Sequence, residues 1–292
     1  MTNAAWQPLG AIDDPDKRFE GLYQDVPAWL DVSLWDWIYA RFTRITGTTR
    51  MPITRLNIDL LRQAERVCKF SSGFTGDATK VSSACQCLKH AITSSKDKLA
   101  VWRLVDFLLS TGVGAPAENK LETILLEAGS AWTVGMRLEK VGLEQRVPVG
   151  VKEAAERVAA QSGNAGTRLA QAWAAAYGVQ PDPANAYSLA IKAVEDAVIP
   201  EVEPNNAKAT LGTSIGQVIA DGDWKMPMLR EHANHPTHEV LIGMLRALWT
   251  GQHDRHGGTG LPPVGQEEAE AAVILAVALV DLFVTKKARR AP

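Results

Sequence analysis

The sequence predicts a mainly α-helical protein with one short β-hairpin near its middle. Through most of the 292 residues, apolar side chains recur at three- and four-residue spacing, the pattern of amphipathic helices. Glycine and proline punctuate these segments where helices begin and end. Because the period changes only around 130–149, we expect an N-terminal helical part (1–129), a β-hairpin connector (130–149) and a C-terminal helical bundle (150–292).

The composition is that of a globular protein with a substantial core, at 46% hydrophobic and 22% charged residues. The formal net charge is −2, so no overall basic excess indicates a nucleic-acid binder, and only a local patch or a transient substrate remains open. Residues 1–20 lack the apolar stretch of a secretory signal. The longest apolar run, 271–280, is too short to span a bilayer. We therefore expect a cytoplasmic protein without membrane contact.

The first helix is expected at 27–42, with Pro27 in its first turn. Its tryptophans Trp29, Trp35 and Trp37 are interpreted as structural, because aromatic stripes at helical spacing are usually buried. Four more helices are expected in the N-terminal part, at 52–70, 78–94, 96–112 and 116–129. The connector follows, with alternating and β-branched residues in 130–134 and 143–149.

The C-terminal part has six expected helices. Asp182 and Pro183 form a typical helix start, and 271–280 is apolar on nearly every side. Such a helix must be buried centrally or at a subunit interface, so we expect a dimer or higher oligomer. The expected helices are 151–161, 167–178, 182–202, 205–221, 237–251 and 265–287.

The common cofactor and hydrolase motifs are absent. The sequence contains no GxxxxGK[ST], GxGxxG, HExxH or GxSxG pattern, and the three cysteines show no CxxC spacing. His232, His235 and His238 could share a helical face and bind a metal, but Pro236 interrupts the segment. A solvated loop is the favoured interpretation there, and a pH-sensitive contact is a further alternative. The sequence thus predicts neither a cofactor nor a metal.

The strongest candidate site is the segment from Arg246 to His256, which ends in GQHDRHGG. Arg246 and His253 are seven positions apart, two turns of a helix, and Arg255 and His256 fall in a glycine-rich turn. A neutral imidazole could take the proton of an RNA 2′-hydroxyl while a guanidinium stabilises the phosphorane, without a metal. The alternative is a polar connector in which Asp254 and Arg255 pair locally.

Residues 150–287 resemble the C-terminal domain of abortive-infection proteins, a branch of the HEPN superfamily. The matching segments are AYSLAIKAVEDAVIP, NNAKATLGTSIGQVI, VLIGMLRALW, DRHGG and EEAEAAVILAVALVDLF. The resemblance implies an up-and-down bundle of about four to five helices. It also implies dimerisation and, for active members, metal-independent cleavage of RNA.

The chain departs from the catalytic signature of that family, an arginine followed by a polar residue and, a few residues later, a histidine. When the family's His-Gly is aligned on His256 and Gly257, its arginine falls on Trp249 and its polar residue on Thr250. Two replacements are open. Arg246 can act with His253, or His256 can act with Arg255 or with an arginine from a second subunit.

The sequence therefore predicts a phage-defence or toxin-like protein of the abortive-infection type, with RNA as its target. Arg246, His253, Arg255 and His256 are the candidate catalytic residues. The alternatives are a non-catalytic HEPN-like module that binds a protein or nucleic acid, and a helical assembly protein.

Overall fold

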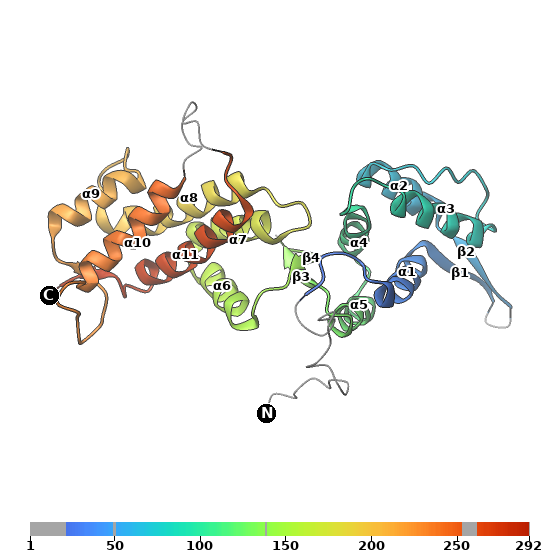
Figure 1. The fold of residues 1–292 in the computed structure, drawn as a ribbon, viewed down its shortest axis with the longest axis horizontal. Coiled ribbons are helices and arrows are strands. Elements are labelled where there is room, and N and C mark those ends of the chain that lie inside the picture. Colours follow the sequence, from blue (N-terminus) through green and yellow to red (C-terminus); the bar gives the residue numbers. More distant parts are fainter. Residues whose placement is uncertain (1–21, 49–50, 138, 253–261, 292) are drawn as a thin grey trace, which may run out of the picture. The chain divides into compact units, whose positions relative to one another are not determined.

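The computed structural model describes residues 22–48, 51–137, 139–252 and 262–291. It is mainly helical, as predicted, and divides into two compact units, residues 1–146 and 147–292 (Figure 1). Among the residues that it places, no helix has the length and apolarity needed to cross a bilayer.

The first unit combines helices with two β-hairpins. Its elements are α1 (Ala28–Phe42), β1 (Thr43–Thr48), β2 (Met51–Leu56), α2 (Ile58–Cys68), α3 (Val81–Thr93), α4 (Ala100–Ser110), α5 (Ala115–Glu127), β3 (Trp132–Arg137) and β4 (Lys140–Gln145). The antiparallel β3–β4 pair, in register Trp132↔Gln145, confirms the hairpin expected within 130–149.

The β1–β2 hairpin corrects the prediction that 130–149 holds the only β-structure and that a helix covers 52–70. Residues 43–56 contain five threonines and two isoleucines, whose β-branched side chains favour strands. Asn57 then starts α2, because its side chain accepts a hydrogen bond from the Leu60 N–H at 3.3 Å.

Tryptophans fill the core of the first unit. Trp37, Trp102 and Trp132 are almost completely buried. The indole N–H of Trp37 donates to the Ala117 carbonyl at 2.8 Å and so joins α1 to α5. The indole N–H groups of Trp102 and Trp132 both donate to the Gln24 carbonyl, which fixes the segment before α1 on the core.

The second unit is a helical bundle with one short strand pair. Its elements are α6 (Val149–Gln161), α7 (Gly163–Tyr177), α8 (Pro183–Val202), α9 (Leu211–Asp221), β5 (Trp224–Lys225), α10 (Thr237–Gly251), α11 (Gln266–Val284) and β6 (Arg289–Arg290). The sequence pattern does not predict the β5–β6 pair. Helix α9 begins later than predicted because Thr210 caps it through the Thr213 N–H.

The central contacts of this bundle join α8 to α7 and to α11 (Figure 1). Alanines dominate them, which lets the helix axes approach closely. The buried alanines are Ala165, Ala172 and Ala176 on α7, Ala186, Ala190, Ala193 and Ala197 on α8, and Ala269, Ala272 and Ala276 on α11.

Helix α11 is therefore covered largely by its own unit. Val273, Leu279 and Val280 are buried in the core, whereas Ala271, Ala278 and Ile274 are exposed. Much of the apolar 271–280 segment thus needs no second subunit for its burial, and one stripe remains uncovered.

The tryptophan interpretation yields a matched pair of variants. Trp35 and Trp37 are buried as expected, whereas Trp29, on the same helix, is 51% exposed against 1% for Trp37, so the expected burial is wrong for Trp29. We expect Trp37→Ala to lower the free energy of unfolding by about 3–5 kcal/mol, through lost burial and a cavity. Trp29→Ala should cost less than Trp37→Ala, because its ring is half-exposed and it loses only the hydrogen bond to the Ala128 carbonyl and the edge contact with Tyr23. Urea unfolding monitored by circular dichroism measures both, and equal losses would contradict the assignment of the core.

Candidate functional site

Arg246 is the one candidate catalytic residue that the structure describes. It lies on α10 with its side chain exposed, and it makes no hydrogen bond or ion pair with another described residue. Its guanidinium is therefore available to a ligand. His253, Arg255 and His256 lie outside the described residues.

Helix α10 runs through Gly251 and ends there. The next residue, Gln252, has φ −76° and ψ 88°, which is not helical. Helix α10 therefore ends before the seven-residue spacing from Arg246 to His253 is complete. The expectation that these two side chains share a helical face is supported only up to Gly251.

Trp249, at the position of the family's arginine, has a packing role. It is half-buried against the bundle core, and it lies close to α9. A Cβ atom placed on Gly212 would lie 2.7 Å from the Trp249 Cζ2 atom, so only glycine leaves room for the indole. The ring occupies space between α9 and α10.

The end of α10 is tied to α8 by one buried tyrosine. The Tyr187 hydroxyl donates to the Leu248 carbonyl at 3.1 Å, one of the carbonyls that a helix end leaves without a helical partner. A Cβ atom on Gly251 would lie 2.2 Å from the Tyr187 Oη atom. A glycine is thus required where the chain leaves α10 toward the predicted site.

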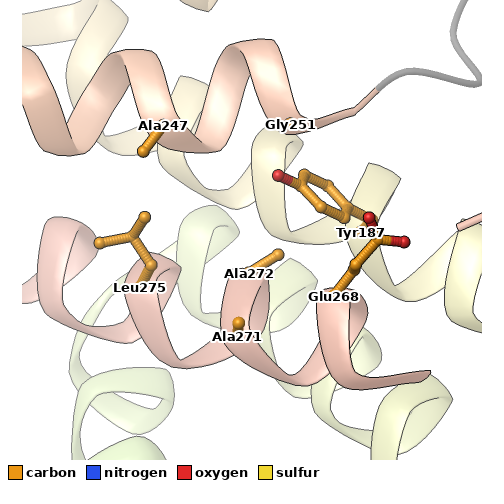
Figure 2. A pocket seen from close by; sticks show the side chains of 7 residues that line it. All are labelled: Tyr187, Ala247, Gly251, Glu268, Ala271, Ala272 and Leu275. Atoms are coloured by element: carbon orange, nitrogen blue, oxygen red, sulfur yellow. The ribbon is translucent and has the colours of Figure 1, made fainter. Parts of the chain in front are cut away.

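Beside this helix end lies a pocket of about 250 Å³, shown in Figure 2. Its wall is mostly apolar, and the Glu268 carboxylate and the Tyr187 hydroxyl are its polar groups. Glu268 also accepts a hydrogen bond from the Gly265 N–H at 2.7 Å, which fixes the start of α11. The lining residues are Tyr187, Ala247, Gly251, Glu268, Ala271, Ala272 and Leu275.

Arg246 precedes Ala247 on the helix and does not line the pocket. The pocket and the guanidinium are therefore separate features of the same helix end. Sequence reasoning missed Tyr187 and Glu268, because both are distant in sequence from Gly251 and belong to no motif.

The histidine segment does not form a metal-binding set. His232 and His235 stack with ring centroids 5.3 Å apart, whereas His238 Nδ1 lies 2.8 Å from the Trp224 carbonyl. Within the described ranges, no three histidine, cysteine or acidic side chains are grouped so that they could hold a metal ion.

Two of the three cysteines, Cys68 and Cys85, are poor nucleophiles. Burial raises the pKa of the Cys68 thiol to about 11, with a further increase from the charge of Asp106. Burial also raises the pKa of the Cys85 thiol. Both thiols are protonated at neutral pH, and the thiolate is the reactive form.

Comparisons with protein-family models, curated proteins and solved structures find nothing that matches this chain. The resemblance to abortive-infection proteins therefore rests on the sequence segments quoted above.

The contact between Tyr187 and Gly251 predicts an inverted effect of a glycine substitution. Alanine normally stabilises a helix relative to glycine by about 0.5–1 kcal/mol. Gly251→Ala should instead destabilise the protein by about 1–3 kcal/mol, because the new methyl group overlaps the Tyr187 hydroxyl.

Two controls test the cause. A Cβ atom added to Gly243, also on α10, would have no neighbouring atom within 4 Å, so Gly243→Ala should stabilise the protein. Tyr187→Phe removes the overlapping oxygen, so Gly251→Ala should cost less in that background. Urea unfolding of the four variants measures the coupling, and additive free energies would refute the proposed contact.

Proposed function

We propose that this chain is a protein of the abortive-infection type and that its C-terminal unit cleaves RNA without a metal. The observation that carries the proposal is the exposed Arg246 guanidinium, unpaired among the described residues, near the end of the helix that leads to His253, Arg255 and His256. The helical bundle and the quoted sequence segments support it.

The chemistry needs few groups. A neutral histidine accepts the proton of the 2′-hydroxyl, and the 2′-oxygen attacks the adjacent phosphorus. An arginine stabilises the charge on the phosphorane, and the 5′-oxygen takes a proton from water as it leaves. The products are a 2′,3′-cyclic phosphate and a 5′-hydroxyl end, with no change in oxidation state.

A second function is favoured by Trp249. Because this ring is packed beside Gly212, the position of the family's arginine serves the fold. A non-catalytic bundle that binds a protein or nucleic acid would need no arginine there, and it is the function that remains if RNA is not cleaved.

Growth after induced expression, followed by an assay of the purified protein, tests the nuclease. We expect the wild type to arrest growth and to cut RNA. Loss of both activities in Arg246→Ala and His253→Ala would identify the first pair of residues, and loss in Arg255→Ala and His256→Ala would identify the second. Arg230→Ala, an exposed control outside the proposed site, should behave as the wild type. Intact RNA after incubation with folded wild-type protein would reject the nuclease in favour of the binding module.

The same assay reports the mechanism. The rate should rise as the pH passes about 6.5, the ordinary pKa of an imidazole, and then level, because the base must be neutral. A chelator should leave the rate unchanged, and the products should carry cyclic phosphates. Dependence on a divalent metal would exclude this mechanism.

We also propose that two copies associate through the exposed stripe of α11. Ala271, Ile274 and Ala278 repeat at three- and four-residue spacing, the pattern of helix pairs packed in a seam. Glu267 and Glu268 lie at the start of the helix, and Lys286 and Lys287 lie just beyond its end. An antiparallel copy would place the acidic start of one helix beside the basic end of the other. Within one chain, Lys286 and Lys287 already pair with Glu201 and Asp281, so the apolar stripe is the main contact of this proposed dimer.

Sedimentation tests this association. We expect about twice the monomer mass of 31.6 kDa for the wild type, and a monomer for Ile274→Glu. Ile219 on α9 has nearly the same exposure, 41% against 39%, so Ile219→Glu is a matched control that should remain a dimer. A monomeric wild type at micromolar concentration would disprove the proposal.

A further inference from the structure

The β1–β2 hairpin of the first unit is exposed on both faces. Its strands pair antiparallel in the register Arg44↔Arg55, Ile45↔Thr54 and Thr46↔Ile53, and all six of these residues are exposed. In Figure 1 the hairpin extends away from α1 and α3, the helices that its strands contact. A two-stranded ribbon without cover is marginally stable in water, so this arm is unusual as a purely structural element.

The charges on the hairpin are all of one sign. Residues 43–56 contain three arginines and no acidic residue. Arg44 stands directly opposite Arg55, and like charges in this position repel each other. Neither guanidinium makes a hydrogen bond or ion pair with another described residue. The arrangement carries an electrostatic cost that a bound anion would remove.

Asp77, whose charge interacts with that of Arg55, does not neutralise the arginine pair. Hydrogen bonds from the Thr79 side chain and backbone lower the pKa of Asp77, and the positive charges of Lys80 and Arg55 lower it further. The Asp77 carboxylate accepts both hydrogen bonds from Thr79, at 2.5 and 2.8 Å. The single negative charge of Asp77 is thus shared between Lys80 and the hairpin arginines. The surface of the hairpin therefore keeps a net positive charge.

The apolar side chains are divided between the two faces. Opposed residues share a face, and so do alternate residues of one strand. Arg44, Arg55 and Ile53 therefore lie on one face, whereas Ile45 lies with Thr54 on the other. A ribbon that entered a lipid surface would place its isoleucines on one face. This ribbon instead places both arginines on one face, and arginine is a side chain that proteins use to bind phosphates.

We propose that the β1–β2 hairpin binds double-stranded DNA, with Arg44 and Arg55 bound to backbone phosphates. The major groove of B-form DNA is wide enough for a two-stranded ribbon, whereas that of A-form RNA is too deep and narrow for side chains to read. This interaction involves the first unit of the chain, whereas the proposed RNA cleavage involves the second. DNA binding by the hairpin does not depend on RNA cleavage.

The test is binding of the full-length protein to a short fluorescent DNA duplex, measured by anisotropy over a range of salt concentrations. Each phosphate contact adds about 0.9 to the slope of log affinity against log salt. We expect Arg44→Gln/Arg55→Gln to reduce this slope by about 1.8. At 0.1 M salt that change corresponds to a loss of roughly 60-fold in affinity.

Matched variants separate the site from bulk charge and from misfolding. Arg157→Gln/Arg230→Gln makes the same charge change at exposed positions of the second unit, and it should leave the slope unchanged. Arg44→Lys/Arg55→Lys keeps both charges and should retain the slope. The thermal midpoint of the glutamine variant should equal or exceed that of the wild type, because the repulsion is removed.

Several results would overturn the proposal. They are an absence of duplex binding by the wild type, an equal loss in the Arg157 and Arg230 control, and a slope that the hairpin variant does not change. Tighter binding to single-stranded RNA that depends on Arg44 and Arg55 would also overturn it. So would binding to vesicles of phosphatidylserine and phosphatidylcholine that needs the two arginines while duplex DNA is not bound.

Discussion

The close packing of α8 against α7 and α11 is the contact on which the second unit depends. It is lined by alanines such as Ala190 and Ala276, which are fully buried. Small side chains let the backbones approach, and they leave little room for adjustment, because an added methylene in a tight core forces neighbouring atoms to move. The ends of the surrounding helices are therefore held in fixed positions relative to α8.

The end of α10 shows what this rigidity does for the candidate site. Tyr187 belongs to α8 and binds the Leu248 carbonyl, so the position of α8 determines where α10 stops. Gly251 then passes within contact of the same hydroxyl. In the proposed nuclease, the chain would enter the predicted site from a fixed point, which helps to position a catalytic group.

The first unit is built on a different principle. Large aromatic residues hold it together, and the indole N–H groups of Trp102 and Trp132 share one backbone acceptor, the Gln24 carbonyl. This core leaves the β1–β2 hairpin outside it, with Arg44 opposite Arg55. Proteins tolerate features that oppose stability mainly where function requires them. The repulsion between Arg44 and Arg55 therefore indicates a function for the β1–β2 hairpin.

The helical class, the β3–β4 hairpin and the bounds of several helices follow from local sequence patterns. Helix α10 is predicted at 237–251 and is found there, because its apolar period and its proline and glycine ends are local signals. The helix predicted at 52–70 is wrong in its first part. That prediction continues the helical pattern of the second half back to Pro52, but residues 52–56 form a strand that pairs with β1. Pairing partners are not visible in a local pattern.

The grouping of the candidate side chains, in contrast, depends on the tertiary structure. Spacing identifies Arg246 and Trp249, but it does not show that one is exposed and the other packed beside Gly212. It does not show the pocket either, because Tyr187, Gly251 and Glu268 come from three helices. Local periodicity depends on neighbours in the chain, whereas a site depends on close approach between distant segments. That approach exists only after the alanine-lined helices have packed.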